Sequence, residues 1–259
     1  MFASDTFKPD KLGGRNASRW NWDYISSNLS FELVGEYLES YKDYWNWEII
    51  AERIASNYSA GSSLLEKFAQ CLQYVEEDKS DTAWRVLSSR LPYTELKKTI
   101  KDTYRNPLYH WNYTEFSQNK EFDITTDLDE CRAFVDWHAL SSSVYVDRQL
   151  KYDKRRGIQQ KAWNNTVKTL LKDENNHWDY RALSSFDSLK SERWFLSSFK
   201  DQLDWEVISS ESKLFVNENK DELHAFIEEF KDYIAFELLS SRPDIKNMAF
   251  ISKSFPQAS

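Results

Sequence analysis

Two arginine–histidine pairs are the residues whose types and spacing could perform acid–base chemistry. They are Arg105 with His110 and Arg132 with His138. An arginine can stabilise the charge of a phosphate and a histidine can move a proton near neutral pH, so each pair has the groups that phosphodiester cleavage needs. The sequence contains no His-x-x-x-His, no Cys-x-x-Cys and no glycine-rich phosphate loop. We therefore expect no catalytic residues, no metal site and no cofactor.

The first pair nevertheless has a likeness to a known enzyme motif. Arg105-Asn-Pro-Leu-Tyr-His110 resembles the active-site motif of HEPN ribonucleases, which pair two such motifs across a helical dimer. The resemblance implies RNA cleavage by Arg105 and His110. Two observations disfavour it: both histidines occupy positions of a repeated motif described below, and the formal net charge of −8 opposes binding to a polyanion. A HEPN-like ribonuclease is the last of three functional alternatives.

Composition narrows the class of protein further. The acidic balance disfavours broad contact with nucleic acid or an anionic membrane surface. Five Gly and five Pro in 259 residues leave few breaks in regular structure, which favours helices. Two cysteines make no disulfide framework, and no apolar run approaches the roughly 18 residues that a membrane span needs. The expected protein is soluble and cytoplasmic, without a membrane partner.

One basic segment stands out in this acidic chain. It consists of Arg148, Lys151, Lys154, Arg155 and Arg156. Such a local positive patch is typical of contact with phosphate, nucleic acid or an acidic partner. A solvated helix face is the alternative interpretation. The segment lies in a singular stretch around residues 143–176, and insertions in repeat arrays often fall on a binding face, so these five residues are the candidate binding site.

A motif that recurs eight times dominates the sequence. It consists of an aromatic residue, two variable residues, an aliphatic residue or Phe, and a serine. The aromatic positions are Trp22, Trp47, Trp84, Tyr113, Trp137, Tyr180, Trp205 and Phe236. The copy at Trp47 has Ala51 at the serine position. Because the shortest intervals are about 25 residues, the pattern indicates tandem repeats whose aromatic residues form the core.

The motif has the features of a helix start. An Asn or Asp precedes the aromatic residue in six copies, and these residues can cap the first turn. They are Asn21, Asn46, Asn112, Asp136, Asp179 and Asp204. The aromatic residue is then the first helical residue, and the aliphatic residue lies on the same face. The serines are expected to end this helix or cap the next one. Longer amphipathic helices fill the intervals, as Leu223, Phe226, Ile227 and Phe230 illustrate.

Helix pairs of this kind predict an all-α protein. One pair cannot bury its apolar face alone, so stacked neighbours would form an α-solenoid; an irregular helical bundle is the alternative. The expected organisation is a lead-in at residues 1–18, a repeat domain at 19–242 with an insertion around 143–176, and a tail at 243–259.

The repeat also resembles a known sequence type. The phrase LDWEVISS at residues 203–210, with SFKDQ just before it, is similar to short tandem repeats of the form Asp-Trp-x-x-Leu-Ser. These occur in uncharacterised proteins of bacteria and large DNA viruses, and the likeness covers about residues 20–242. It implies a scaffold. The leading hypothesis is a non-catalytic interaction module that binds a protein partner, and the second is nucleic-acid contact through residues 148–156.

If the aromatic residues of the motif lie in the core, replacing one of them with alanine should strongly lower the free energy of unfolding. Replacing Trp205 with alanine should lower the free energy of unfolding by about 3–5 kcal/mol, as for other large core aromatics. Urea unfolding of the two proteins measures the difference. An unchanged free energy of unfolding would contradict the core position.

Overall fold

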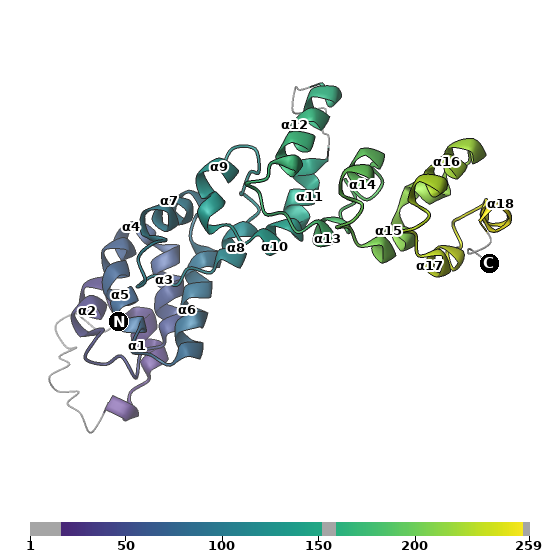
Figure 1. Ribbon diagram of the computed structural model, residues 1–259. Coiled ribbons are helices and arrows are strands. Elements are labelled where there is room, and N and C mark those ends of the chain that lie inside the picture. Colours follow the sequence, from purple (N-terminus) through teal and green to yellow (C-terminus); the bar gives the residue numbers. More distant parts are fainter. Residues whose placement is uncertain (1–16, 152–158, 256–259) are drawn as a thin grey trace. The chain divides into compact units, whose positions relative to one another are not determined.

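The computed structural model describes residues 17–151 and 159–255, and within these ranges the chain forms helices and no strand. Its contacts divide the chain into two compact units, Met1–Phe122 and Asp123–Ser259. The boundary falls between the fourth and fifth copies of the motif. Figure 1 shows the helices of both units, and each unit is described below by itself.

The first unit, coloured purple to teal in Figure 1, carries the motif copies at Trp22, Trp47, Trp84 and Tyr113. Its elements are η2 (Ala17–Arg19), α1 (Trp22–Asn28), α2 (Phe31–Tyr37), α3 (Trp47–Ser56), α4 (Tyr58–Gly61), η3 (Ser62–Leu64), α5 (Leu65–Leu72), α6 (Glu77–Arg90), α7 (Tyr93–Thr103) and α8 (Tyr113–Ser117). Helices α3 and α6 pack most extensively, and α1 packs on α3.

The second unit carries the copies at Trp137, Tyr180, Trp205 and Phe236. Its elements are α9 (Leu128–Cys131), η4 (Arg132–Phe134), α10 (Trp137–Ser141), α11 (Val144–Leu150), α12 (Gln160–Lys172), α13 (Tyr180–Leu183), α14 (Arg193–Phe199), α15 (Trp205–Glu211), η6 (Lys213–Val216), α16 (Lys220–Phe230), α17 (Phe236–Ser240) and α18 (Met248–Ser254). The amphipathic helix expected around Leu223 is α16, whose apolar side chains are buried.

The predicted helix caps are confirmed in all six copies. Asn46, for example, has φ −82° and ψ 97°, and its side chain accepts a hydrogen bond from the amide of Ile49. The side chains of Asn21, Asn112, Asp136, Asp179 and Asp204 do the same at their own helices. The aromatic residue begins the helix in seven copies. Trp84 is the exception, because it lies inside α6.

The aliphatic position faces the interior in every copy. Ile25 is 8% exposed, and the equivalent residues of the other seven copies are fully buried. The aromatic residues are buried in five copies, while Tyr113, Trp137 and Tyr180 are half-buried. Trp47 and Trp205 each donate their indole N–H to a lysine carbonyl five residues earlier, at 3.0 and 2.7 Å. The helix start is thereby tied to the preceding turn.

The serine position has a role that the sequence did not predict. Several helices do end at or beside it, as expected, but its hydroxyl also accepts a hydrogen bond from the backbone amide of the next cap residue. Ser26 receives the amide of Asn46 at 3.1 Å and Ser184 that of Asp204 at 2.8 Å. Ser88, Ser141 and Ser209 receive the amides of Asn112, Asp179 and Ala235. All five serines are fully buried. The serine therefore joins one motif to the next.

In three of these five junctions, an aromatic contact accompanies the serine bond. The residue just before the cap, here called the pre-cap residue, packs edge-on against the aromatic ring of the preceding motif. Trp45 packs on Trp22 with ring centroids 5.1 Å apart. Trp111 packs on Trp84 at 5.0 Å, and Trp178 packs on Trp137 at 5.3 Å. Edge-to-face aromatic pairs of this kind contribute beyond the area they bury.

The variable position that follows the aromatic residue also takes part in the junction. The sequence suggested that this position varies freely, but its side chain contacts the side chain of the next cap. Asn46 donates to Asp23 at 2.8 Å. Arg181 donates to Asp204 at 3.3 Å. His138 Nδ1 lies 2.6 Å from Asp179 Oδ2, so each cap side chain meets a polar partner of suitable charge.

The serine bond predicts a position-specific loss of stability. Replacing Ser209 with alanine leaves the amide of Ala235 without its acceptor, so the free energy of unfolding should fall by about 1–3 kcal/mol. The neighbouring Ser210→Ala is the matched control, because Ser210 is exposed and bonds only within its own helix. Its effect should stay within about 0.5 kcal/mol. Equal effects in urea unfolding would contradict a linking role for the buried serine.

Candidate functional site

The two side chains of the first arginine–histidine pair contact different aromatic rings. The Arg105 guanidinium lies over the ring of Tyr104, 5.2 Å from its centroid. The His110 ring lies against Trp84, with centroids 6.4 Å apart. Equivalent contacts occur between His177 and Trp137 in another motif. His110 thus has the same packing partner as other residues at its motif position.

The second pair is bound to carboxylates. Arg132 contacts Asp129 and Asp173 at 3.0 and 3.2 Å. His138 contacts the cap residue Asp179. These carboxylates balance the charge that a phosphate would otherwise meet. The two pairs belong to different units.

The predicted basic patch is described only in part. Lys154, Arg155 and Arg156 lie outside the described residues. Arg148, on α11, lies over the ring of Tyr145 with 5.9 Å to the centroid. Lys151 follows α11 and lines a cavity of about 280 Å³, together with Gln160, Asn164, Val167, Trp194 and others. The five basic residues remain a predicted site, of which the structure places two.

A buried lysine beside this cavity pairs with two exposed carboxylates. Lys190 is 9% exposed and bonds to Asp187 and Glu211, at 2.8 and 2.6 Å. Asp187 itself lines the cavity. The hydrogen bond from Lys190 lowers the pKa of the Asp187 carboxyl below its ordinary value. Because Lys190 is already held by two carboxylates, it stabilises the wall instead of offering a free charge to a ligand.

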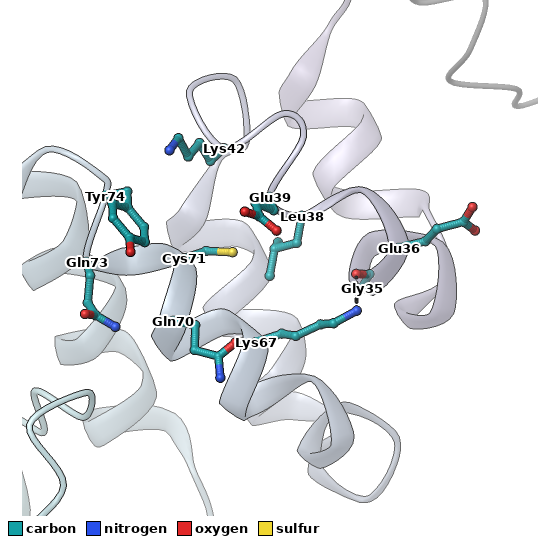
Figure 2. A pocket seen from close by; sticks show the side chains of 10 residues that line it. All are labelled: Gly35, Glu36, Leu38, Glu39, Lys42, Lys67, Gln70, Cys71, Gln73 and Tyr74. Carbon is teal, nitrogen blue, oxygen red and sulfur yellow. Dashed lines mark hydrogen bonds between the residues drawn. The ribbon is translucent and has the colours of Figure 1, made fainter.

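A larger cavity, of about 310 Å³, lies beside α2 and α5 (Figure 2). We call it the α2–α5 cleft. Its lining residues are Gly35, Glu36, Leu38, Glu39, Lys42, Lys67, Gln70, Cys71, Gln73 and Tyr74. Helix α2 is held in place by Ser30, which caps it, and by Val34, which is fully buried. Helix α5 buries Phe68 and Leu72 on its opposite face. Most lining side chains are therefore ones that the two helices leave outside the core, while Leu38 and Cys71 are buried beneath the cleft.

The basic side chains of the cleft are already occupied. Lys67 extends across it and donates to the Gly35 carbonyl at 3.1 Å, as the dashed line in Figure 2 shows. The Lys42 ammonium lies over the ring of Tyr74, 4.7 Å from its centroid. Glu36 and Glu39 are exposed, and neither forms an ion pair or side-chain hydrogen bond within the described parts of the chain. The cleft thus has two carboxylates and two ammonium groups, none of which forms an ion pair within the described residues.

Two further side chains define its chemical character. Tyr74 is 70% exposed, the highest value among the large hydrophobic residues described. Cys71 is buried, and burial followed by the nearby Glu39 charge raises the pKa of its thiol. A thiol with a raised pKa is a poor nucleophile at neutral pH. The arrangement suits non-covalent binding: an exposed ring beside two carboxylates.

Sequence reasoning missed this cleft for a clear reason. Glu36, Glu39 and Tyr74 lie in the intervals between motif copies, and the chain has 42 carboxylates with no pattern that distinguishes these two. Only the packing of α2 near α5 brings them beside one exposed ring.

Comparisons with protein-family models, with curated proteins and with solved structures find no match to this chain. Within residues 17–151 and 159–255, no group of three or more His, Cys, Asp or Glu side chains is placed to hold a metal ion. No helix in the same ranges is both long and apolar enough to cross a membrane.

The ion pair between Lys190 and Asp187 predicts how stability depends on pH. The lowered pKa of Asp187 means that its contribution is present above its unfolded-state pKa, about 3.9, and is lost as the pH falls through the folded-state value. Lys190→Met should therefore be less stable than the wild type at pH 7, and the difference should shrink below about pH 4. Unfolding by urea across this range measures it.

The control is Lys246→Met, which removes an exposed ion pair with Glu218. Exposed pairs contribute little, so this variant should match the wild type throughout. A stability difference for Lys190→Met that persists undiminished at pH 2.5 would contradict the ionic explanation.

Proposed function

We propose that the protein is a non-catalytic interaction module whose helix pairs stack as an α-solenoid and whose α2–α5 cleft binds a protein partner. The observation that carries the proposal is the cleft itself, where an exposed Tyr74 adjoins two carboxylates without ion-pair partners. A cytoplasmic location remains the expectation from the sequence.

The motif residues support a scaffold role. The buried serines, the pre-cap aromatics and the cap side chains all contact neighbouring motifs. Side chains committed to such contacts hold the helices together and are not available to a partner. Binding is then the task of residues outside the motif, and the cleft is built from them.

The chemistry of the cleft favours a partner segment with Lys or Arg side chains. A cation from the partner can pair with Glu36 or Glu39 and lie on the face of Tyr74, where Lys42 already shows that the ring accepts a cation. Tyrosine is also enriched among residues that dominate binding energy at interfaces. The net charge of −8 steers a basic partner toward the protein.

Site-specific photo-cross-linking tests the proposal. A benzophenone amino acid at position 74 should capture a discrete partner from native extract, whereas the same group at Val144, an exposed position in the second unit, should not. The partner is then purified. Its affinity for Glu39→Gln and for Tyr74→Ala should fall about tenfold for each, a change of about 1.4 kcal/mol.

The matched control is Glu174→Gln, an exposed carboxylate in the second unit, which should bind like the wild type. Added salt should weaken wild-type binding, because an exposed ion pair is screened. Unchanged affinity in both cleft variants would reject the cleft as the binding site. Capture of RNA or DNA in place of protein would reject the class of partner.

A further inference from the structure

The five junctions with a serine bond have two complementary halves. One half, here called the docking half, consists of a pre-cap side chain, a cap amide and a cap side chain. The other, the receiving half, belongs to the preceding motif and consists of its aromatic ring, its variable residue and its serine. In the junction between Trp22 and Trp47, the docking half is Trp45 with Asn46, and the receiving half includes Asp23 and Ser26.

The docking half of the Trp22 motif meets no other motif within the described residues. Trp20, its pre-cap residue, is 46% exposed, whereas the equivalent Trp45, Trp111 and Trp178 are 4%, 4% and 5% exposed. The backbone amide of Asn21 donates no hydrogen bond within the described residues, although five equivalent amides bond to serines. The Asn21 side-chain oxygen caps its own helix, which leaves its NH₂ group available.

In the receiving half of the Phe236 motif, the variable residue and the serine are exposed, whereas the Phe236 ring is 7% exposed and stacks on Phe255. Ser240, at the serine position, is exposed, whereas the serines in the five junctions are fully buried. Its hydroxyl donates to the Glu237 carbonyl at 2.8 Å, and no described group donates to it. Glu237, at the variable position, is exposed and forms no ion pair in the described part of the chain.

These two halves match each other. In the junction between Trp22 and Trp47, an Asn cap donates its side-chain NH₂ group to an acidic residue at the variable position, Asp23. Asn21 and Glu237 have the same pair of types. The unbonded amide of Asn21 matches the free acceptor of Ser240, and the exposed indole of Trp20 matches the aromatic ring that begins the motif, Phe236.

We propose that a second copy of this chain docks head to tail: Trp20 and Asn21 of one copy bind the Phe236–Ser240 helix of another. Asn21 donates its backbone amide to Ser240 and its side-chain NH₂ group to Glu237. In the single chain, Phe255 stacks on Phe236 with ring centroids 6.3 Å apart. Trp20 of the second copy would contact the same ring, so its docking displaces Phe255. Because the two surfaces differ, the contact is heterologous and extends to further copies. The proposal uses no residue of the α2–α5 cleft, so the two proposals stand independently.

A charge exchange tests the specific pairing. Analytical ultracentrifugation of the wild type should show a mass that rises with concentration. Asn21→Asp keeps a capping side chain but places a carboxylate opposite Glu237, so association should weaken about tenfold or more. The double variant Asn21→Asp, Glu237→Lys creates the carboxylate–cation pair seen between Asp204 and Arg181, and association should return. The matched control is Tyr24→Ala, an exposed aromatic of α1, which should associate like the wild type.

A mixing experiment tests the head-to-tail geometry. Trp20→Ala has a defective docking half, and Ser240→Arg has a blocked receiving half, so each variant alone should be monomeric. Mixed together they retain one intact half each and should form a complex of two chains. Circular dichroism confirms that the variants are folded. A wild type that stays monomeric at high concentration, or association that survives both single changes, would overturn the proposal.

Discussion

The arrangement of motifs depends on one constraint: a cap residue's own amide has no partner in the helix that it begins. Stacking another helix against that amide removes water from it, and an unsatisfied buried amide costs about 1–3 kcal/mol. The buried serine supplies the missing acceptor. Its hydroxyl can donate within its own helix, as Ser88 does to Trp84, and still accept from the next motif. A small side chain with both capacities can lie fully buried, which explains why serine recurs there.

The copy without serine supports this explanation. At Trp47 the serine position holds Ala51, which is fully buried. The following aromatic residue, Trp84, lies inside the long helix α6, where the preceding backbone amides bond within the helix. That junction therefore has no cap amide in need of an acceptor, and the residue at the serine position, Ala51, has no hydroxyl to supply one. The same change leaves the Trp84 indole N–H without a hydrogen-bond partner among the described residues, because its helix replaces the turn that serves Trp47.

The local part of this structure could be predicted from the sequence, and the long-range part could not. Caps, helix starts and the buried aliphatic residue depend on neighbours within one turn, and these predictions match the structure. The serine bond joins residues such as Ser141 and Asp179, far apart in sequence across intervals of unequal length. No feature of the sequence near the serine indicates which distant amide it will bind. The α2–α5 cleft was missed for a similar reason, since Glu39 and Tyr74 meet only after two helices pack.

The variable position gives the junctions their selectivity. The serine bond is made to backbone, so it accepts any cap and cannot distinguish one motif from another. The contact beside it can, because an Asn cap meets Asp23 whereas the Asp caps at 179 and 204 meet His138 and Arg181. Exchanging these partners would place two carboxylates together or leave a cation without its acceptor, and such mismatches disfavour the wrong neighbour. A uniform backbone bond thus accompanies the stacking, and the side-chain pair beside it differs among these three junctions.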